Sequence, residues 1–82
     1  MAGCTEIINT NGEYESVTTL TGLSFTEGKT YNMQIQNAAY LKVGDAEFCF
    51  INEKFDYTAG SEDLKIKTDM AQCVLTILEV EE

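Results

Sequence analysis

Carboxylates are the most abundant groups in this chain that could do chemistry. Fourteen of the 82 residues are Asp or Glu. Five of them are candidates for a calcium site between strands: Glu53, Asp56, Glu62, Asp63 and Asp69. Calcium loops that can be recognised from sequence space their acids tightly, as in D-x-D-x-D-G, and this spacing is absent. The pattern therefore favours a solvated acidic surface. A carboxylate pair could also hydrolyse glycosides, but so small a domain lacks the depth of a substrate cleft.

Thiols are the second reactive group. Cys4, Cys49 and Cys73 are widely spaced, and the chain has no histidine to complete a zinc site or to activate a nucleophile. Cys49 and Cys73 lie in apolar runs, where a free thiol behaves as a small buried hydrophobe, and both should react slowly in the native state. Cys4, near the N-terminus, is the candidate for a redox or interchain role. We predict a non-enzymatic protein with no catalytic residues, no metal and no cofactor.

Charge narrows the classes of partner. The net charge is -9, and all five basic residues are lysines. Such a surface repels nucleic acid, whose binding depends on neutralising phosphates, and it disfavours anionic membranes. The first ten residues contain no basic region and no long apolar run, so we expect no signal peptide. Direct nucleic-acid binding and membrane association are therefore not expected.

The elements that carry these residues follow a period of two. Residues 31–36 alternate apolar and polar side chains, which predicts a half-buried strand. Residues 39–43 and 46–51 are β-rich runs separated by Gly44 and Asp45, which predicts a tight hairpin with Gly44 at a positive φ. A two-residue turn pairs Val43 with Ala46 and places the alternate apolar residues of both strands on one face.

The other segments fit the same plan. Residues 17–25 are rich in threonine and predict a strand with a bulge at Gly22. Shorter apolar alternations cover residues 55–57 and 64–67, and residues 73–80 form the strongest β segment. This spacing predicts an all-β fold, a small antiparallel β-sandwich or barrel of six to seven strands. Residues 1–82 form a single domain, with residues 1–16 as a partly flexible N-terminal arm.

The last segment is apolar on both faces. One face carries Cys73, Leu75 and Ile77, and the other carries Val74, Leu78 and Val80. Two interpretations of the second face remain open: a second sheet covers it, or it forms a contact between subunits.

A further surface candidate and the strand edges point to association. Tyr40 should lie on the face opposite Leu41 and is a candidate protein-contact residue with the second face of the last strand. The chain contains no proline, one of the residues that block pairing at sheet edges. A homo-oligomer or multicopy array is therefore expected.

The C-terminal two thirds resemble a known class of proteins. The run Lys29-Thr30-Tyr31-Asn32-Met33-Gln34-Ile35-Gln36, the hairpin at Val43-Gly44-Asp45, and the order Phe55-Asp56-Tyr57, Asp63-Leu64-Lys65-Ile66-Lys67-Thr68 and Val74–Val80 are similar to small virion proteins of tailed phages and prophages. The resemblance covers about residues 29–80. It implies a head decoration or head–tail accessory subunit that contacts other virion proteins, such as a major capsid or tail protein. It also implies synthesis in the host bacterial cytoplasm and a location in the virion.

Two alternatives belong to other classes. A small acidic inhibitor could imitate nucleic acid, but its acids should then line one face, whereas here they are spread through the turns and both ends of the chain. A carbohydrate-binding β-sandwich would need exposed planar aromatics in a row, and the absence of Trp weakens that reading.

Overall fold

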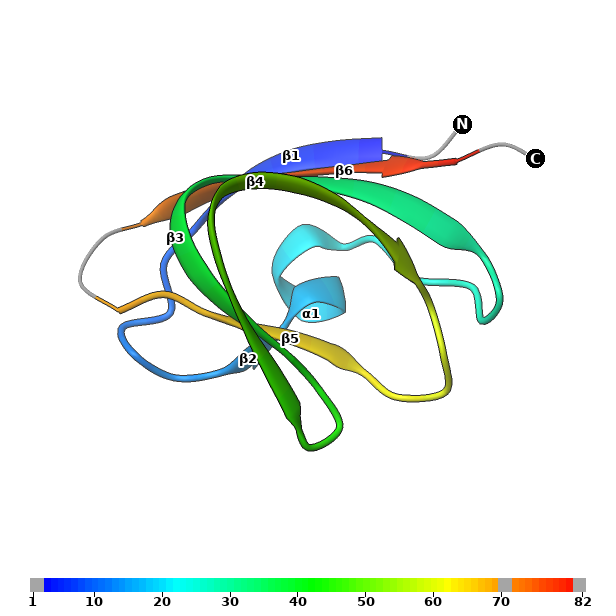
Figure 1. Cartoon of the computed structure of the whole chain (residues 1–82), viewed down its shortest axis with the longest axis horizontal. Helices are drawn as coiled ribbons and strands as arrows, with labels where there is room; N and C mark the ends of the chain where they lie inside the picture. Colours follow the sequence, from blue (N-terminus) through cyan, green and yellow to red (C-terminus); the bar gives the residue numbers. More distant parts are fainter. Residues whose placement is uncertain (1–2, 70–71, 81–82) are drawn as a thin grey trace.

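The described part of the backbone forms one antiparallel sheet of six strands that curls around its own apolar face (Figure 1). The computed structural model describes residues 3–69 and 72–80. Its elements are β1 (Gly3–Ile8), β2 (Glu15–Ser16), α1 (Val17–Thr21), β3 (Thr30–Val43), β4 (Ala46–Thr58), β5 (Leu64–Lys67) and β6 (Cys73–Glu79). The predicted all-β class and strand number are thus confirmed. Among the described residues, no helix combines the length and the apolar character needed to cross a membrane.

Strand β3 organises the sheet. One of its edges pairs with β4 along almost its whole length. The other edge pairs with β6 through residues 31–36 and with β5 through residues 40–43. Strand β1 extends the first half beyond β6, and β2 extends the second half beyond β5. The two halves of the curled sheet therefore share the β3–β4 hairpin as their common element.

A bulge between the halves lets the hairpin bend. The register of β3 against β4 shifts between Ile35 and Ala38. Asn37 and Asn52 face each other there with φ values of 71° and 48°, a region that asparagine tolerates better than most residues. The Asn37 N–H donates to Asn52 Oδ1 at 2.8 Å. The same bulge joins the residue runs 31–36 and 39–43 into one continuous strand.

The predicted hairpin turn is confirmed in register and in backbone geometry. Val43 pairs with Ala46, and Leu41 pairs with Phe48 further along the strands. Gly44 has a φ of 58°, as a primed turn requires. The alternation in β5 is also confirmed, because Leu64 and Ile66 are buried in the core.

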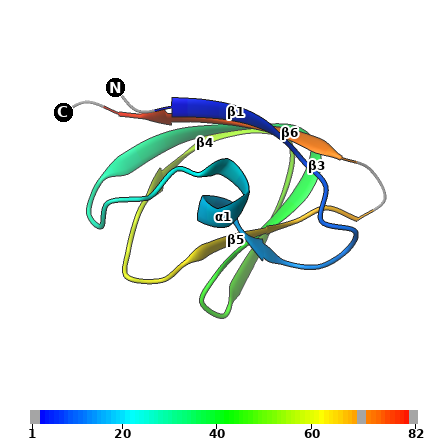
Figure 2. The same ribbon diagram turned by 180° about the vertical axis from the view of Figure 1, so that it is seen from behind.

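The strand predicted at residues 17–25 is wrong. Residues Val17–Thr21 form the single-turn helix α1, which lies inside the curl of the sheet (Figures 1 and 2). Gly22, read as a strand bulge, is its C-cap at a φ of 77°, and its N–H donates to the Thr18 carbonyl oxygen at 2.8 Å. The β propensity of the threonines is overridden because Val17 is buried and Leu20 packs against the core.

We expect Gly22→Ala to lower the free energy of unfolding by about 1 kcal/mol, because alanine must adopt a left-handed conformation there. A Cβ at this position would have no atom within 4 Å, so the backbone alone sets the cost. Gly60 supplies the control: it lacks a positive φ, and a Cβ there would also meet nothing. Urea unfolding should show Gly60→Ala to be neutral; an equal loss in both variants would contradict the cap assignment.

Strands β1 and β2 bring part of the N-terminal segment into the sheet. Residues 1–16 were expected to form a partly flexible arm, yet Gly3–Ile8 pairs with β6 from Gly3↔Leu78 to Ile8↔Cys73. Ile8 is buried in the core, and the short strand β2 pairs with β5. The apolar pattern of this segment is too short to show such pairing, which joins residues far apart in the sequence.

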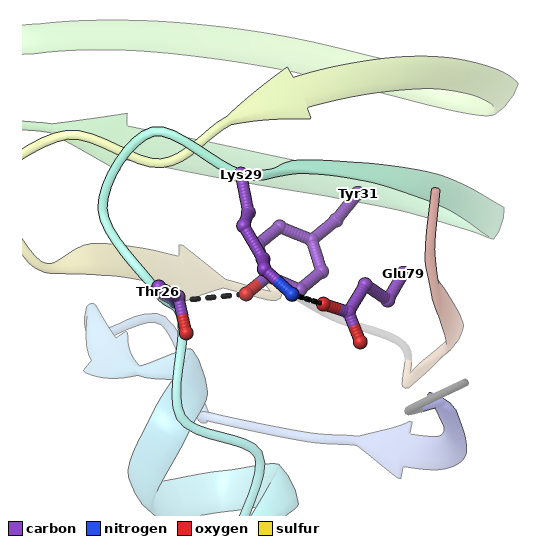
Figure 3. Close-up of polar contacts among 4 residues, drawn as sticks. All are labelled: Thr26, Lys29, Tyr31 and Glu79. Carbon is purple, nitrogen blue, oxygen red and sulfur yellow. Dashed lines mark hydrogen bonds and ion pairs between the residues drawn. The ribbon is translucent and has the colours of Figure 1, made fainter. Parts of the chain in front are cut away.

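A tyrosine at the start of β3 holds the turn that precedes this strand. The buried ring of Tyr31 meets Phe25 edge to face, with ring centroids 4.9 Å apart. Its hydroxyl oxygen accepts a hydrogen bond from the Thr26 N–H at 2.8 Å, and beside it Lys29 forms an ion pair with Glu79 (Figure 3). This end of β3 therefore anchors both the 26–29 turn and the end of β6.

Candidate protein-contact surface

The two faces of β6 have different environments. Cys73, Leu75 and Ile77 point into the curl and are fully buried. Val74 is half-buried on the outer side, where Leu78 is 41% exposed. Val80, just beyond the end of β6, is 39% exposed. The prediction that a second sheet covers this face is therefore wrong for the described residues. They form one sheet, and only the inner side of that sheet is covered when it curls. The alternative of a subunit contact stays a prediction.

Strand β1 adds a residue that the sequence analysis did not single out. Ile7 pairs with Val74 and is 64% exposed on the same side of the sheet. Between the apolar positions, the hydroxyls of Thr5 and Thr76 share a hydrogen bond of 3.2 Å. The adjacent pair Ile7–Ile8 indicates such an exposed apolar residue. Neighbouring residues of a strand point to opposite faces, so only one of the two isoleucines can enter the core.

This surface, called the outer apolar face, consists of Thr5, Ile7, Val74, Thr76, Leu78 and Val80. None of its members is charged. The β3 residues paired with β6 on this side are the neutral Asn32, Gln34 and Gln36. In a chain with a net charge of -9, three adjacent strands thus share a side without charge. Exposed apolar positions gathered in this way are typical of an interaction surface.

Tyr40 lies elsewhere. It is on the other side of the bulge, half-buried and paired with Lys67 of β5 and Cys49 of β4. The Lys67 ammonium lies between two tyrosine rings, 4.8 Å from the centroid of Tyr40 and 4.9 Å from that of Tyr14. The predicted contact residues therefore divide into two groups, and Tyr40 packs with a lysine instead of joining the outer apolar face.

Tyr14 holds this second group together. Its hydroxyl donates to Glu47 Oε1 at 2.8 Å, and its ring lies 5.5 Å from the Lys42 ammonium. Burial of the phenol, followed by the hydrogen bond and negative charge of Glu47, raises the pKa of Tyr14 to about 12. The phenol therefore stays protonated at neutral pH and keeps donating. This cluster fixes the segment before β2 onto β3, β4 and β5.

The thiols do not share one environment. Cys73 is fully buried as predicted, and burial raises the pKa of its thiol. Cys4 is half-buried in β1. The prediction of a buried Cys49 is wrong: it is exposed, because it pairs with Tyr40 on the outer side while Phe48 and Phe50 take the inner side.

We expect Cys49 to react with a maleimide reagent in the native protein and Cys73 to react only after unfolding, because thiolate formation and access are both suppressed in the core. Single-cysteine variants followed by mass spectrometry would separate the two rates. The same variants in denaturant provide the control, since both thiols should then react fully. Fast native labelling of Cys73 would show that β6 is misassigned.

The acidic residues considered for calcium do not form a ligand set. Within the described residues, no group of three or more His, Cys, Asp or Glu side chains could hold a metal ion. Asp63 accepts a hydrogen bond from the Ser16 hydroxyl at 3.1 Å, and Asp56 accepts one from the Asn32 amide at 3.2 Å. Both therefore serve local polar contacts.

The concave side of the hairpin contains an apolar hollow of about 200 Å³. Apart from Asp56, the residues that shape it are aromatic or aliphatic: Leu41, Val43, Phe48, Phe50, Phe55, Tyr57 and Leu64. Phe50 and Phe55 stack with ring centroids 4.2 Å apart. The hollow is smaller than the roughly 300–1,000 Å³ of ordinary ligand sites, so its geometry suits an apolar side chain better than a substrate.

Comparisons with known proteins give information on the fold alone. No protein-family model and no curated protein matches the sequence. Among solved structures, the chain is similar to the solution NMR structure of a de novo designed double-stranded β-helix, with a TM-score of 0.71 and 12% sequence identity. The similarity covers 98% of this chain and 100% of the designed one. The class defined here is thus a small all-β domain made from one curled sheet, with the fold of a double-stranded β-helix.

Proposed function

We propose that the protein is a non-enzymatic structural or accessory subunit of a tailed-phage virion that acts by protein–protein contact through the outer apolar face. The observation that carries the contact is the exposure of Ile7, Leu78 and Val80 on an uncharged side of a strongly acidic chain. Apolar residues surrounded by neutral polar ones can be buried against a partner without desolvating a charge. The resemblance of residues 29–80 to small virion proteins supports the setting.

The partner in this proposal is another virion protein, such as a major capsid or tail protein, present in many copies. Repetition along a particle suits a small domain, because weak contacts add when copies that are joined to one another bind one lattice. The outer apolar face spans β1 and β6, whose residues pair from Gly3↔Leu78 to Ile8↔Cys73. It therefore presents a surface supported by two hydrogen-bonded strands.

The test uses particles purified from a lysate of the bacterium that carries the gene. Mass spectrometry should find the protein in the particles, and the double variant Ile7→Asp/Leu78→Asp should be missing from them. Far-UV circular dichroism should show that this variant remains folded, because both side chains are exposed. Lys65→Ser, exposed on β5, is the control and should be incorporated normally. Particles that lack the protein, or that retain the double variant, would overturn the proposal.

A further inference from the structure

The outer edge of β4 has no partner strand in the described part of the chain. Among the described strands, β4 pairs with β3 alone, whereas β3 and β6 are paired on both edges. The β3–β4 turn projects beyond the rest of the sheet (Figure 1). Natural proteins protect such edges with proline, charge or a covering segment. Residues 46–52 contain no proline and one charged residue, Glu47.

The hairpin geometry identifies the backbone groups that face this edge. In a hairpin with a two-residue turn, the residues flanking the turn form a hydrogen-bonded pair, here Val43 and Ala46. Because hydrogen-bonded and non-hydrogen-bonded pairs alternate, Phe48 and Phe50 direct their N–H and C=O groups toward β3. Those of Glu47, Cys49 and Ile51 point away from it, toward the open edge.

Side chains along the same segment are exposed and largely apolar. Phe48 is 50% exposed on the inner side, and Ile51 is 60% exposed on the outer side. The one charged side chain, Glu47, is already engaged, because its carboxylate accepts the hydrogen bond from the Tyr14 hydroxyl. The segment ends at Asn52, whose positive φ interrupts the extended backbone. Its low charge lets two copies of an acidic chain approach each other here.

We infer that β4 pairs antiparallel with β4 of a second copy about a two-fold axis at Cys49. A two-fold axis perpendicular to the sheet places the inner sides of both copies on the same side of the joined sheet. A residue on the inner side of one copy therefore pairs with a residue on the inner side of the other, and outer residues pair with outer residues. With the axis at Cys49, the outward backbone groups of Glu47 meet those of Ile51 in the other copy. On the inner side, Phe48 faces Phe50 of the other copy, which covers the exposed Phe48 ring.

This register is preferred for its aromatic pairs. Phe48 and Phe50 become a non-hydrogen-bonded cross-strand pair, the type in which side chains approach most closely, and aromatic pairs of this kind stabilise sheets. With the axis at Cys49, the dimer contains two Phe48–Phe50 pairs. Moving the axis to Phe50 would place Phe48 opposite Asn52 of the other copy, and both of these pairs would be lost. The contact uses a different surface from the outer apolar face, so both can be occupied in one assembly.

The first test acts on the backbone. Under reducing conditions, sedimentation velocity across a concentration series should show a monomer–dimer equilibrium for the parent chain and for Cys49→Ser. Cys49→Pro should be a folded monomer, because it removes an N–H that points to the open edge and leaves the β3–β4 bonds intact. A parent chain that stays monomeric at several hundred micromolar would overturn the inference, and so would a Cys49→Pro variant that still dimerises.

The second test reads the register and does not depend on the proline variant folding. Ile51 faces Glu47 of the other copy, so Ile51→Lys creates two opposite-charge pairs per dimer and Ile51→Glu creates two like-charge pairs. Both substitutions affect the same exposed side chain. The dissociation constant of Ile51→Glu should be about tenfold or more above that of Ile51→Lys, with the gap narrowing in salt. Equal constants would refute the pairing.

The two proposals fail separately. If Ile7→Asp/Leu78→Asp abolishes the dimer while Ile51→Glu has no effect, association occurs through the outer apolar face and the β4 inference is wrong. If Ile7→Asp/Leu78→Asp is missing from the particles but still dimerises, the outer apolar face contacts the particle and β4 joins the copies, as inferred.

Discussion

Replacing Leu75 with alanine is expected to lower the free energy of unfolding by roughly 2–5 kcal/mol, the usual cost of truncating a buried leucine. Leu75 is fully buried on the inner face of β6 and pairs with Ile35 of β3. So large a loss is a major fraction of the stability of a small domain. Urea unfolding followed by far-UV circular dichroism would measure it.

Leu78→Ala is the matched control for this change. The same side chain is removed from the same strand, but from the outer side, where Leu78 is 41% exposed. The expected loss is about 1 kcal/mol or less, since part of the side chain already contacts water. Similar losses for Leu75→Ala and Leu78→Ala would mean that the inner and outer faces of β6 are wrongly assigned.

Thr68→Val is expected to lower the free energy of unfolding by about 1–3 kcal/mol, although the two side chains have nearly the same shape. Thr68 and Thr10 are both buried. The Thr10 N–H donates to Thr68 Oγ1 at 2.8 Å, and the Thr68 N–H donates to Thr10 Oγ1 at 2.9 Å. Valine at position 68 leaves the Thr10 N–H without its acceptor in the interior, and thermal unfolding would measure the cost.

Two further variants isolate the hydrogen bond from packing. Thr68→Ser keeps the hydroxyl and should retain more stability than Thr68→Val. Thr76→Val makes the same change on the outer apolar face, where the hydroxyl shares an exposed hydrogen bond with Thr5, and should change the free energy of unfolding by less than about 0.5 kcal/mol. A Thr68→Val variant as stable as Thr76→Val would show that the reciprocal bonds are absent.

The parts of the fold set by local periodicity could be predicted from the sequence. The turn at Gly44 fixes its own register, and the alternation of Leu64 and Ile66 shows which side enters the core. The prediction failed where tertiary space overrode local propensity: residues 17–21 are β-branched and threonine-rich, yet they form α1 because the curl of the sheet leaves an interior to fill. Propensity alone cannot show that interior.

Only part of the candidate surface could be predicted, because the rest depends on pairing between distant segments. The outward side of β6 followed from its alternation, but the position of Ile7 beside Val74 depends on the pairing of β1 with β6, which joins opposite ends of the described chain. Cys49 was misplaced because residues 48–51 are apolar without a break, so their sequence does not show which positions face inward. The register against Tyr40 decides it.

The pairing of β1 with β6 also sets the order in which the molecule can fold. Thr5 and Thr76, which meet across these strands, are separated by 71 positions in the sequence. The β3–β4 hairpin, in contrast, needs only a two-residue turn to begin. Closing a long loop costs more conformational entropy than closing a short one, and contacts of large sequence separation slow folding. We therefore expect the outer apolar face to be completed late, so that a partially folded chain can contain the β3–β4 hairpin before β1 and β6 pair.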